Sequence, residues 1–220
     1  MTELDLDKAR FNMVEQQVRP WDVLSSEVLD VMSEVPRHAF VADRHKQLAY
    51  SDVQLPLACG EFMMEPKVEG RYLQALAPEA HERVLEIGAG SGYLAACLAR
   101  TASSVRAIEI HDELVRFAQG NLQALGVDNV TVEQGDGAAG FEDGQRYDCI
   151  AVSGSLPEFH EGFHRSLTLG GRLVMLVGRK PAMEALLITR VAEDQWATES
   201  LFETVQPALH NAPVSRRFAL

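Results

Sequence analysis

A set of acidic and glycine residues near the middle of the chain has the spacing of a ligand-binding loop. An apolar, strand-like run ends at Glu86, and glycines follow at alternate positions: Gly88, Gly90 and Gly92. This pattern predicts a strand, a tight turn and a helix, because glycine lets a turn pass close to a ligand without a Cβ in the way. The pattern differs from the dinucleotide fingerprint, whose third glycine is replaced by Tyr93.

Further polar residues follow the later apolar runs. Glu109 ends the next run, about 20 residues beyond the first glycine, where an acid typically accepts hydrogen bonds from a ribose diol. Ile110 is its neighbour. The turn Gly135-Asp136-Gly137 follows a third run, and Asp136 is suited to accept from an adenine amino group. Ser153 follows a fourth. Each residue alone is compatible with an ordinary turn, but the series favours a site for a nucleoside ligand.

The elements that would position these residues alternate between strands and helices. Strands are predicted at residues 83–87, 104–109, 129–134, 147–153 and 171–177, with a strand pair at 185–191 and 195–205. Helices are predicted at 91–101, 112–125 and around 158–168. Alternation of this kind indicates an α/β fold with a mostly parallel sheet and helices on both faces. The strand pair adds an antiparallel hairpin at its end.

The first part of the chain has a different pattern. Helical periodicity covers residues 4–18 and 25–35, and a further helix is predicted at 64–77. Pro36 would end the second of these helices. We therefore expect a helical extension over residues 1–80, packed on a ligand-binding domain over residues 81–220.

Composition narrows the functional classes. The formal net charge is −12, so the surface would mostly repel phosphate backbones, and nucleic acid is not an expected partner. Cys59, Cys97 and Cys149 have no metal-binding spacing and suggest no disulfide framework, which fits a reducing compartment. The first residues lack a signal-peptide pattern, and no apolar run is long enough to span a membrane. We expect a cytoplasmic protein that does not enter the membrane.

Several longer segments resemble one enzyme family. They are Met13-Val-Glu-Gln16, Val35-Pro-Arg-His-Ala-Phe40, Ala49-Tyr50 with Asp52, the Gly88 loop, Gly135-Asp136-Gly137, Tyr147-Asp148 and Leu169-Gly-Gly-Arg172. Together they resemble the protein-L-isoaspartate O-methyltransferases, a family of class I methyltransferases. The resemblance implies a Rossmann-like sheet of seven strands. It also implies S-adenosylmethionine as the methyl donor, held by the glycine loop and the acids described above, and a carboxylate as the acceptor.

The chain departs from this family at the segment that carries its active-site serine. The family has a Gly-Gln-Thr-Ile-Ser-Gln-Pro-like stretch, whereas this chain has Gly60-Glu-Phe-Met-Met-Glu-Pro66. Met64 therefore stands at the serine position and Phe62 at the threonine position. By the resemblance, Met64 occupies the catalytic position, and the acceptor would contact Phe62, Met63 and Ser153. A simpler reading makes Met63 and Met64 core residues at the start of a helix.

Three functional hypotheses remain open from the sequence. The first is methylation of isoaspartyl carboxylates in proteins or peptides. The second is methylation of a different protein or small-molecule acceptor in an altered pocket. The third is a non-catalytic module that binds S-adenosylmethionine.

One motif points to different chemistry. His160-Glu-Gly-Phe-His164 matches the H-E-x-x-H signature of zinc proteases, with Glu184 downstream as a third ligand. Gly162 weakens the helix on which both histidines would share a face, and the stretch before Glu184 reads as a strand. We therefore expect no metal at these residues. Arg216-Arg217 read as surface charges, with attraction of an acidic acceptor as the alternative.

Overall fold

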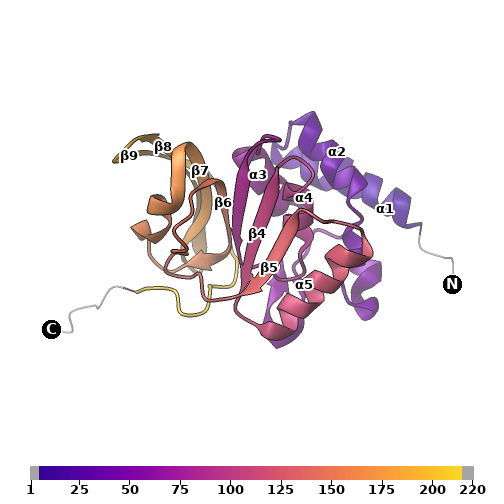
Figure 1. Ribbon diagram of the computed structural model, residues 1–220. Helices are drawn as coiled ribbons and strands as arrows, with labels where there is room; N and C mark the ends of the chain where they lie inside the picture. The colour runs from indigo at the N-terminus through magenta and orange to yellow at the C-terminus, as the bar shows by residue number, and fades with distance from the viewer. Residues whose placement is uncertain (1–4, 215–220) are drawn as a thin grey trace.

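A seven-stranded sheet forms the centre of the molecule. The computed structural model describes residues 5–214. The strands are β3 (Arg83–Ile87), β4 (Ser104–Glu109), β5 (Val130–Gln134), β6 (Tyr147–Leu156), β7 (Leu167–Arg179), β8 (Ala182–Ala192) and β9 (Gln195–Thr204). They lie in the order β5-β4-β3-β6-β7-β8-β9. The pairs from β5 to β7 are parallel, whereas β8 pairs antiparallel with β7 and β9 (Figure 1). The predicted sheet and its terminal hairpin are confirmed.

The strand order reverses direction next to β3. The chain runs outward from β3 through β4 to β5, and then returns to place β6 on the other side of β3. In open α/β sheets, the crevice at such a reversal, beyond the carboxyl ends of the strands, is the usual ligand site. The loops after β3 and β4 and the end of β6 therefore meet where the sequence predicts ligand-binding residues.

The α-helices differ from the prediction mainly in length. They are α1 (Leu6–Met13), α2 (Ser26–Glu34), α3 (Pro66–Leu76), α4 (Tyr93–Leu98) and α5 (Asp112–Ala124). A π-helical turn, Val14–Val18, continues α1, and short 3-10 helices cover Arg19–Trp21, Arg37–Phe40, Asp43–Leu48 and Ala58–Gly60. Residue 4, the predicted start of the first helix, lies outside the described residues. The Ser25 side chain caps α2 by accepting from the Val28 N–H at 3.4 Å.

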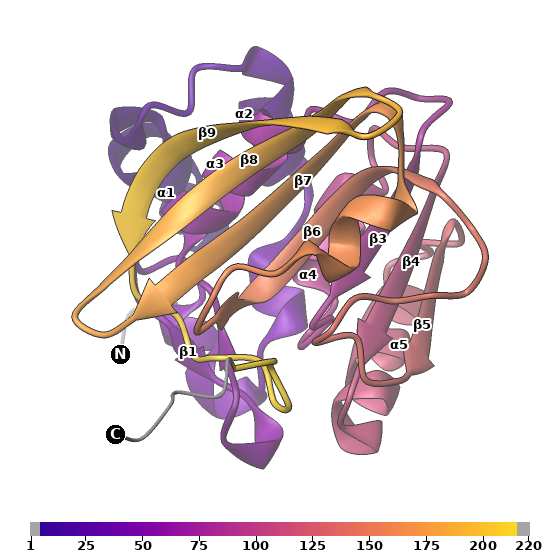
Figure 2. The same ribbon diagram turned by 90° about the vertical axis from the view of Figure 1, so that its left-hand side faces the viewer.

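The prediction of helices on both faces of the sheet is wrong. All five α-helices lie on one face, as Figures 1 and 2 show together. On the other face, instead of the helix expected at 158–168, there is a short 3-10 helix, Glu161–Ser166. A Cβ at Gly162 would lie 1.9 Å from the Ala139 carbonyl oxygen, so this stretch follows a neighbouring loop closely. Phe163 fills the apolar layer beneath it and is fully buried.

The N-terminal elements share a core with the sheet. One hydrophobic cluster runs from Met13 in α1 through Tyr72 in α3 to Val84, Ala107 and Val174 in the strands. The Tyr72 hydroxyl also donates to the Val152 carbonyl of β6 at 3.1 Å. A small antiparallel pair, β1 (Leu55–Pro56) and β2 (Phe62–Met63), was not predicted. The division into residues 1–80 and 81–220 stays a prediction.

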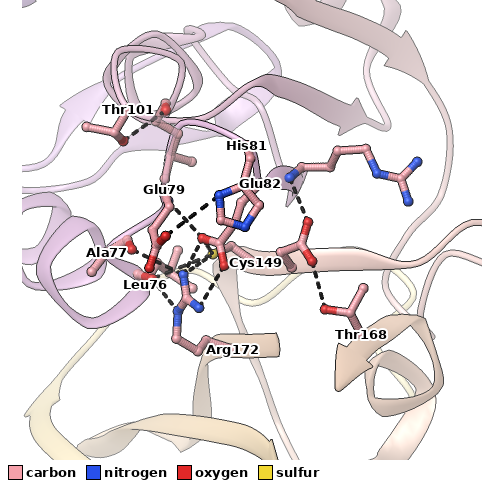
Figure 3. A network of polar contacts seen from close by, with 12 residues as sticks. Leu76, Ala77, Glu79, His81, Glu82, Thr101, Cys149, Thr168 and Arg172 are labelled. Atoms are coloured by element: carbon pink, nitrogen blue, oxygen red, sulfur yellow. Dashed lines mark hydrogen bonds and ion pairs between the residues drawn. The ribbon is translucent and has the colours of Figure 1, made fainter. Parts of the chain in front are cut away.

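At the amino ends of the central strands, a network of charged groups joins β3, β6 and β7. Arg172 donates to both Glu82 carboxylate oxygens, at 3.0 and 2.5 Å, and to the carbonyls of Leu76 and Ala77 at 2.6 and 3.1 Å (Figure 3). The Glu79 N–H also donates to Glu82, at 2.8 Å. The Cys149 thiol lies in the same cluster. Arg172 thus ties the end of α3 to the start of the sheet.

The helices offer no candidate for a membrane span. Within residues 5–214, none is both long enough and apolar enough to cross a bilayer.

Candidate active site

The glycine loop after β3 adopts the backbone that its sequence predicts. Gly88, Gly90 and Gly92 all have positive φ, at 90°, 53° and 84°. Gly88 and Gly90 line a pocket, but Gly92 does not. Gly92 instead caps the start of α4, and a Cβ there would lie 3.2 Å from the Ala118 Cβ of α5. Gly92 therefore allows the two helices to approach closely, whereas the first two glycines face the pocket.

Glu109 holds the glycine loop in place. Its Oε2 accepts from the Gly90 N–H at 2.9 Å, and its Oε1 accepts from the His111 N–H at 3.0 Å. The side chain is buried at the pocket wall. Each carboxylate oxygen has a further lone pair, so these bonds leave room for the ribose diol that the sequence predicts. Ile110 lines the pocket beside it.

Glu86 is an under-satisfied acid inside the protein. Its Oε1 accepts from the Ser153 hydroxyl at 3.2 Å, whereas its Oε2 is buried and has no hydrogen-bond partner among the described residues. Burial raises the pKa of Glu86 well above its usual range. The Ser153 bond opposes this rise, while the charges of Glu109 and Glu69 add to it.

Ser153 lies inside a strand rather than after one. The sequence predicts that β6 ends at 153, but the strand continues to Leu156, with a register shift between Ala151 and Ser155. Such an irregularity leaves residues out of the ladder and re-aims their side chains. This accounts for Ser153 reaching the Glu86 carboxylate across the sheet.

Asp136 follows β5 and also lines the pocket. Its Oδ1 accepts from the Ala138 N–H at 3.1 Å, and its Oδ2 accepts from the Asn211 side-chain amide at 2.8 Å. Gly135 and Gly137 also line the pocket. A Cβ at Gly137 would lie 2.6 Å from the end of the Ile87 side chain, so this turn packs closely against β3.

The segment at the family's serine position forms another wall. Met63 and Met64 are buried, and Phe62 is 44% exposed, yet all three line the pocket. Met63 and Met64 also belong to the main apolar cluster, so they are both core residues and pocket residues.

Arg37 supports this segment from below. It is fully buried, donates to the Met64 carbonyl oxygen at 2.5 Å, and forms an ion pair with Glu69. Its guanidinium carbon lies 4.8 Å from the centre of the Tyr93 ring. The basic residue of the Val35-Pro-Arg-His-Ala-Phe40 motif thus positions the backbone opposite the glycine loop.

The pocket as a whole encloses about 850 Å³ including its open mouth. Its lining contains Phe62, Met63, Met64, Glu86, Gly88, Gly90, Glu109, Ile110, Gly135, Asp136, Gly137 and Ser153. Sequence reasoning missed other lining residues: Leu57, Glu61, Glu69, Ser91, Leu94, Leu114, Ala138 and residues 206–210. Residues 206–210 are far from the glycine loop in sequence. No motif marks them, because a parallel pairing of Ala208 with Ser155 brings them there.

The pocket residues fit the cofactor that the resemblance implies. S-adenosylmethionine carries a ribose diol, an adenine amino group, an ammonium and a sulfonium. The buried, unpartnered Glu86 Oε2 offers an acceptor for a donor group of a ligand. Glu109 and Asp136 add carboxylates to the pocket lining, which favours a cationic ligand.

The zinc-protease motif is not assembled. His160 contacts the Ala138 carbonyl oxygen through Nε2 at 3.0 Å, and its Nδ1 accepts from the Gly162 N–H at 3.2 Å. His164 is buried with its ring 5.2 Å from that of Trp196. Within residues 5–214, neither histidine belongs to a cluster of metal-ligating atoms. Arg216-Arg217 lie outside the described residues.

The sheet, the glycine loop and the acids at the strand ends define a class I methyltransferase site. Two solved structures share the fold. A protein-L-isoaspartate O-methyltransferase superimposes with a TM-score of 0.78 at 24% identity, covering 90% of this chain and 65% of that chain. A Plasmodium falciparum protein, described as a putative enzyme of the same name in complex with S-adenosyl-L-homocysteine, superimposes with a TM-score of 0.77 at 20% identity, covering 94% of this chain and 99% of that one.

The sequence comparisons identify the family. The profile of the protein-L-isoaspartate(D-aspartate) O-methyltransferases matches residues 9–206, and the chain belongs to that family. A protein-L-isoaspartate O-methyltransferase of Rhodopseudomonas palustris is 42% identical over 87% of this chain and 79% of that protein. A Koribacter versatilis relative of the same name is 37% identical over 86% and 84%. These findings confirm the expected enzyme class, a methyltransferase that uses S-adenosylmethionine.

Proposed function

We propose that this enzyme transfers a methyl group from S-adenosylmethionine to the carboxylate of an isoaspartyl residue in a protein or peptide. One observation carries the proposal: a single pocket is lined both by Glu86, Gly88 and Glu109 and by residues 62–64. Relatives that bear the isoaspartate methyltransferase name support this acceptor.

The chain's own residues are sufficient for this chemistry. A carboxylate is ionised at neutral pH, so methyl transfer by in-line displacement needs no general base. The protein's task is to align the two reactants, which lowers a barrier by roughly 7–11 kcal/mol in favourable cases. Glu109 fixes the glycine loop, and Arg37 fixes the backbone at Met64 on the facing wall.

The acceptor wall is more apolar than the resemblance implies. Met64 and Phe62 stand where the family has hydroxyl side chains. Loss of one hydrogen bond to a buried partner costs about 1–3 kcal/mol, or about 10- to 100-fold in rate. We therefore expect weak activity on isoaspartyl peptides, and a greater loss if the bulky side chains also exclude the peptide.

The same wall favours a second candidate, the methylation of a different, more apolar acceptor. Met63, Met64 and Leu94 line the pocket, and Phe62 adds a half-exposed ring. Apolar walls with few polar groups suit an apolar ligand better than a peptide backbone.

Two further features belong to the proposal. The net charge of −12 argues against nucleic acid as an acceptor. A cytoplasmic location is supported by three free cysteines, of which Cys97 and Cys149 are buried in the protein.

The test is an assay with labelled cofactor on isoaspartyl peptide and, in parallel, on a total cell extract. If only the hydroxyl matters, Met64→Ser should recover much of the rate on peptide. If shape matters, recovery should need Met64→Ser together with Phe62→Thr. Phe11→Thr is the matched control, because Phe11 is 64% exposed and does not line the pocket.

The outcomes separate the alternatives. Peptide turnover at the rate of an ordinary family member would show that the hydroxyl is dispensable and the wall not diverged. Labelling of another acceptor in the extract, with none of the peptide, would favour the second candidate. Binding of S-adenosylhomocysteine without transfer to any acceptor would favour the third hypothesis, a non-catalytic module that binds the cofactor.

A further inference from the structure

Three side chains able to ligate a metal converge at the rim of the pocket. They are Glu61, His111 and His210, and their ligand atoms all lie within 4.8 Å of one another. Glu61 Oε1 is 3.4 Å from His111 Nε2 and 2.7 Å from His210 Nε2. Glu61 and His210 line the pocket itself. The group is distinct from the His160-His164 motif and comes from three separated parts of the chain.

The backbone around each residue is held in place. Glu61 is fixed by a turn in which the Leu57 N–H donates to the Glu61 carbonyl at 2.8 Å. His111 is the residue before α5, and its N–H donates to Glu109 at 3.0 Å. His210 follows Leu209, whose N–H donates to the Ser155 carbonyl at 2.9 Å. Three fixed backbones therefore direct these side chains to one point.

The separations suit a tetrahedral zinc-type centre. With Zn–N and Zn–O bonds of about 2.0–2.2 Å, tetrahedral ligand atoms lie roughly 3.3–3.5 Å apart. The distance of 3.4 Å between Glu61 and His111 already meets this. The distance of 2.7 Å to His210 must lengthen, which the His210 side chain permits because it is 53% exposed.

We propose that Glu61, His111 and His210 bind one divalent transition metal of the zinc class at the pocket rim. Two imidazoles and one carboxylate form a donor set that such metals favour. Nearby carboxylates in the pocket lining, Glu109 and Asp136, add a favourable field for a cation. The three protein ligands leave a coordination position for water or for an oxygen of the acceptor, as in zinc sites that are not purely structural.

A metal here would also add a link between parts of the pocket that are far apart in the sequence. Glu61 directly precedes Phe62, and His210 directly follows Leu209, whose side chain lies against Gly88 and Gly154. A bound metal would therefore link Glu61, and with it residues 62–64, to residues 205–210. In the alternative arrangement, Glu61 is only a hydrogen-bond and ion-pair partner of the two histidines.

The test is a titration of the full-length, ligand-free protein with Co²⁺, followed by visible absorption. We expect one Co²⁺ per chain with the d–d bands of a four- or five-coordinate site, displaced by Zn²⁺. His111→Ala and His210→Ala should each weaken binding at least about tenfold, since even loss of an outer-shell partner costs about 10–100-fold. His81→Ala is the matched control, because His81 is exposed and pairs with Glu79 outside the pocket.

Other outcomes would overturn the proposal. Absence of Co²⁺ bands would leave the hydrogen-bonded arrangement, and binding retained in His210→Ala would place the metal elsewhere. Loss of binding in His160→Ala instead would assign it to the H-E-x-x-H motif. Because an alanine variant that unfolds proves nothing, Glu61→Gln, which keeps the side-chain size, repeats the test with circular dichroism as a check on folding.

The metal proposal can be tested separately from the proposed methyl transfer. Glu86→Gln should leave Co²⁺ binding within about twofold of the unaltered protein, because Glu86 is not in the cluster. Conversely, failure of the Co²⁺ titration would leave cofactor binding and methyl transfer unaffected as proposals.

Discussion

Two glutamates four residues apart in the chain, Glu82 and Glu86, show how the two ends of one strand differ. Glu82 precedes β3 and accepts from Arg172 and from the Glu79 N–H. Burial alone would raise the pKa of Glu82, but these hydrogen bonds outweigh it and hold the pKa below its usual value. Glu86, near the carboxyl end of β3, has one bond from Ser153 and a pKa raised by burial.

The difference indicates where the fold is stabilised and where it is prepared for a ligand. At the amino end, the buried charges are paired within the protein, and the network joins α3, β3 and β7. At the carboxyl end, a buried acceptor has no partner in the protein, which costs free energy in the absence of a ligand. Because Glu86 lines the pocket, a bound ligand can satisfy this acceptor.

The largest expected effect comes from breaking the ion pair between Arg172 and Glu82 at the amino end of β3. Arg172→Met should lower the free energy of unfolding by about 3 kcal/mol, at the low end for a buried pair because the Arg172 side chain is 22% exposed. Urea unfolding measures this change. Arg100→Met is the control: its pair with Glu34 is exposed, and its loss should cost about 1 kcal/mol or less.

The same variant tests the separation of the two ends. S-adenosylhomocysteine should bind folded Arg172→Met with unchanged affinity, because the network does not reach the pocket lining. In addition, the free energy of unfolding of this variant should depend less on pH in the acid range. The stability that Glu82 supplies is present above its unfolded pKa of about 4.5 and is lost as pH falls through the lowered folded pKa. A strong loss of cofactor affinity would break the comparison.

The next largest effect concerns cofactor affinity. Glu109→Ala removes the acceptor for the Gly90 and His111 amides and for the predicted ribose hydrogen bonds. At about 0.5–1.5 kcal/mol for each bond to the ligand, binding of S-adenosylhomocysteine should weaken at least several-fold. Calorimetry measures the change, and Glu133→Ala serves as a control on an acid outside the pocket. Unchanged affinity would remove Glu109 from the cofactor site.

The smallest expected effect has opposite signs for stability and binding. Glu86→Gln should stabilise the ligand-free protein by about 1 kcal/mol at neutral pH, because a neutral amide replaces a buried acid but still lacks a partner. The folded pKa of Glu86 is raised, so its ionisation costs stability as pH rises above about 4.5. The difference in the free energy of unfolding between the variant and the unaltered protein should therefore increase with pH and vanish in acid.

The variant should also bind S-adenosylhomocysteine more weakly. Thermal unfolding across pH and calorimetry give the two readouts. A variant that loses stability while keeping full affinity would mean that Glu86 serves the fold rather than the ligand.

Residues at the ends of strands were predictable because two local signals coincide there. The apolar run predicts the bounds of β3, residues 83–87, and the structure has the same bounds. The glycines that follow predict a tight loop, and all three have positive φ in the structure. The helix expected at 158–168 fails because Gly162 packs against Ala139, a contact with no trace in local periodicity. Arg172 was noted as part of a motif, but its partner Glu82 lies 90 residues away in sequence.

The part of the pocket lining formed by residues 206–210 could not be predicted, for the same reason. Leu209 and His210 have no local pattern, and only the pairing of Ser155 with Ala208 brings them to the glycine loop. The role of Arg37 behind Met64 likewise depends on a contact between segments 27 residues apart. Sequence motifs identified the cofactor side of the site, whereas the acceptor side depends on tertiary packing.

The attachment of residues 205–211 has a consequence for exchange of the bound molecule. This segment follows the sheet and is held by polar contacts to other parts of the chain, among them Gln54 to the Val205 carbonyl at 2.8 Å, Gln206 to Glu65 at 2.7 Å and Asn211 to Asp136 at 2.8 Å. Breaking them would free one wall of the pocket while all seven strands stay paired. Local opening of a segment costs less free energy than unfolding of the whole domain, so the bound molecule could exchange without loss of the sheet.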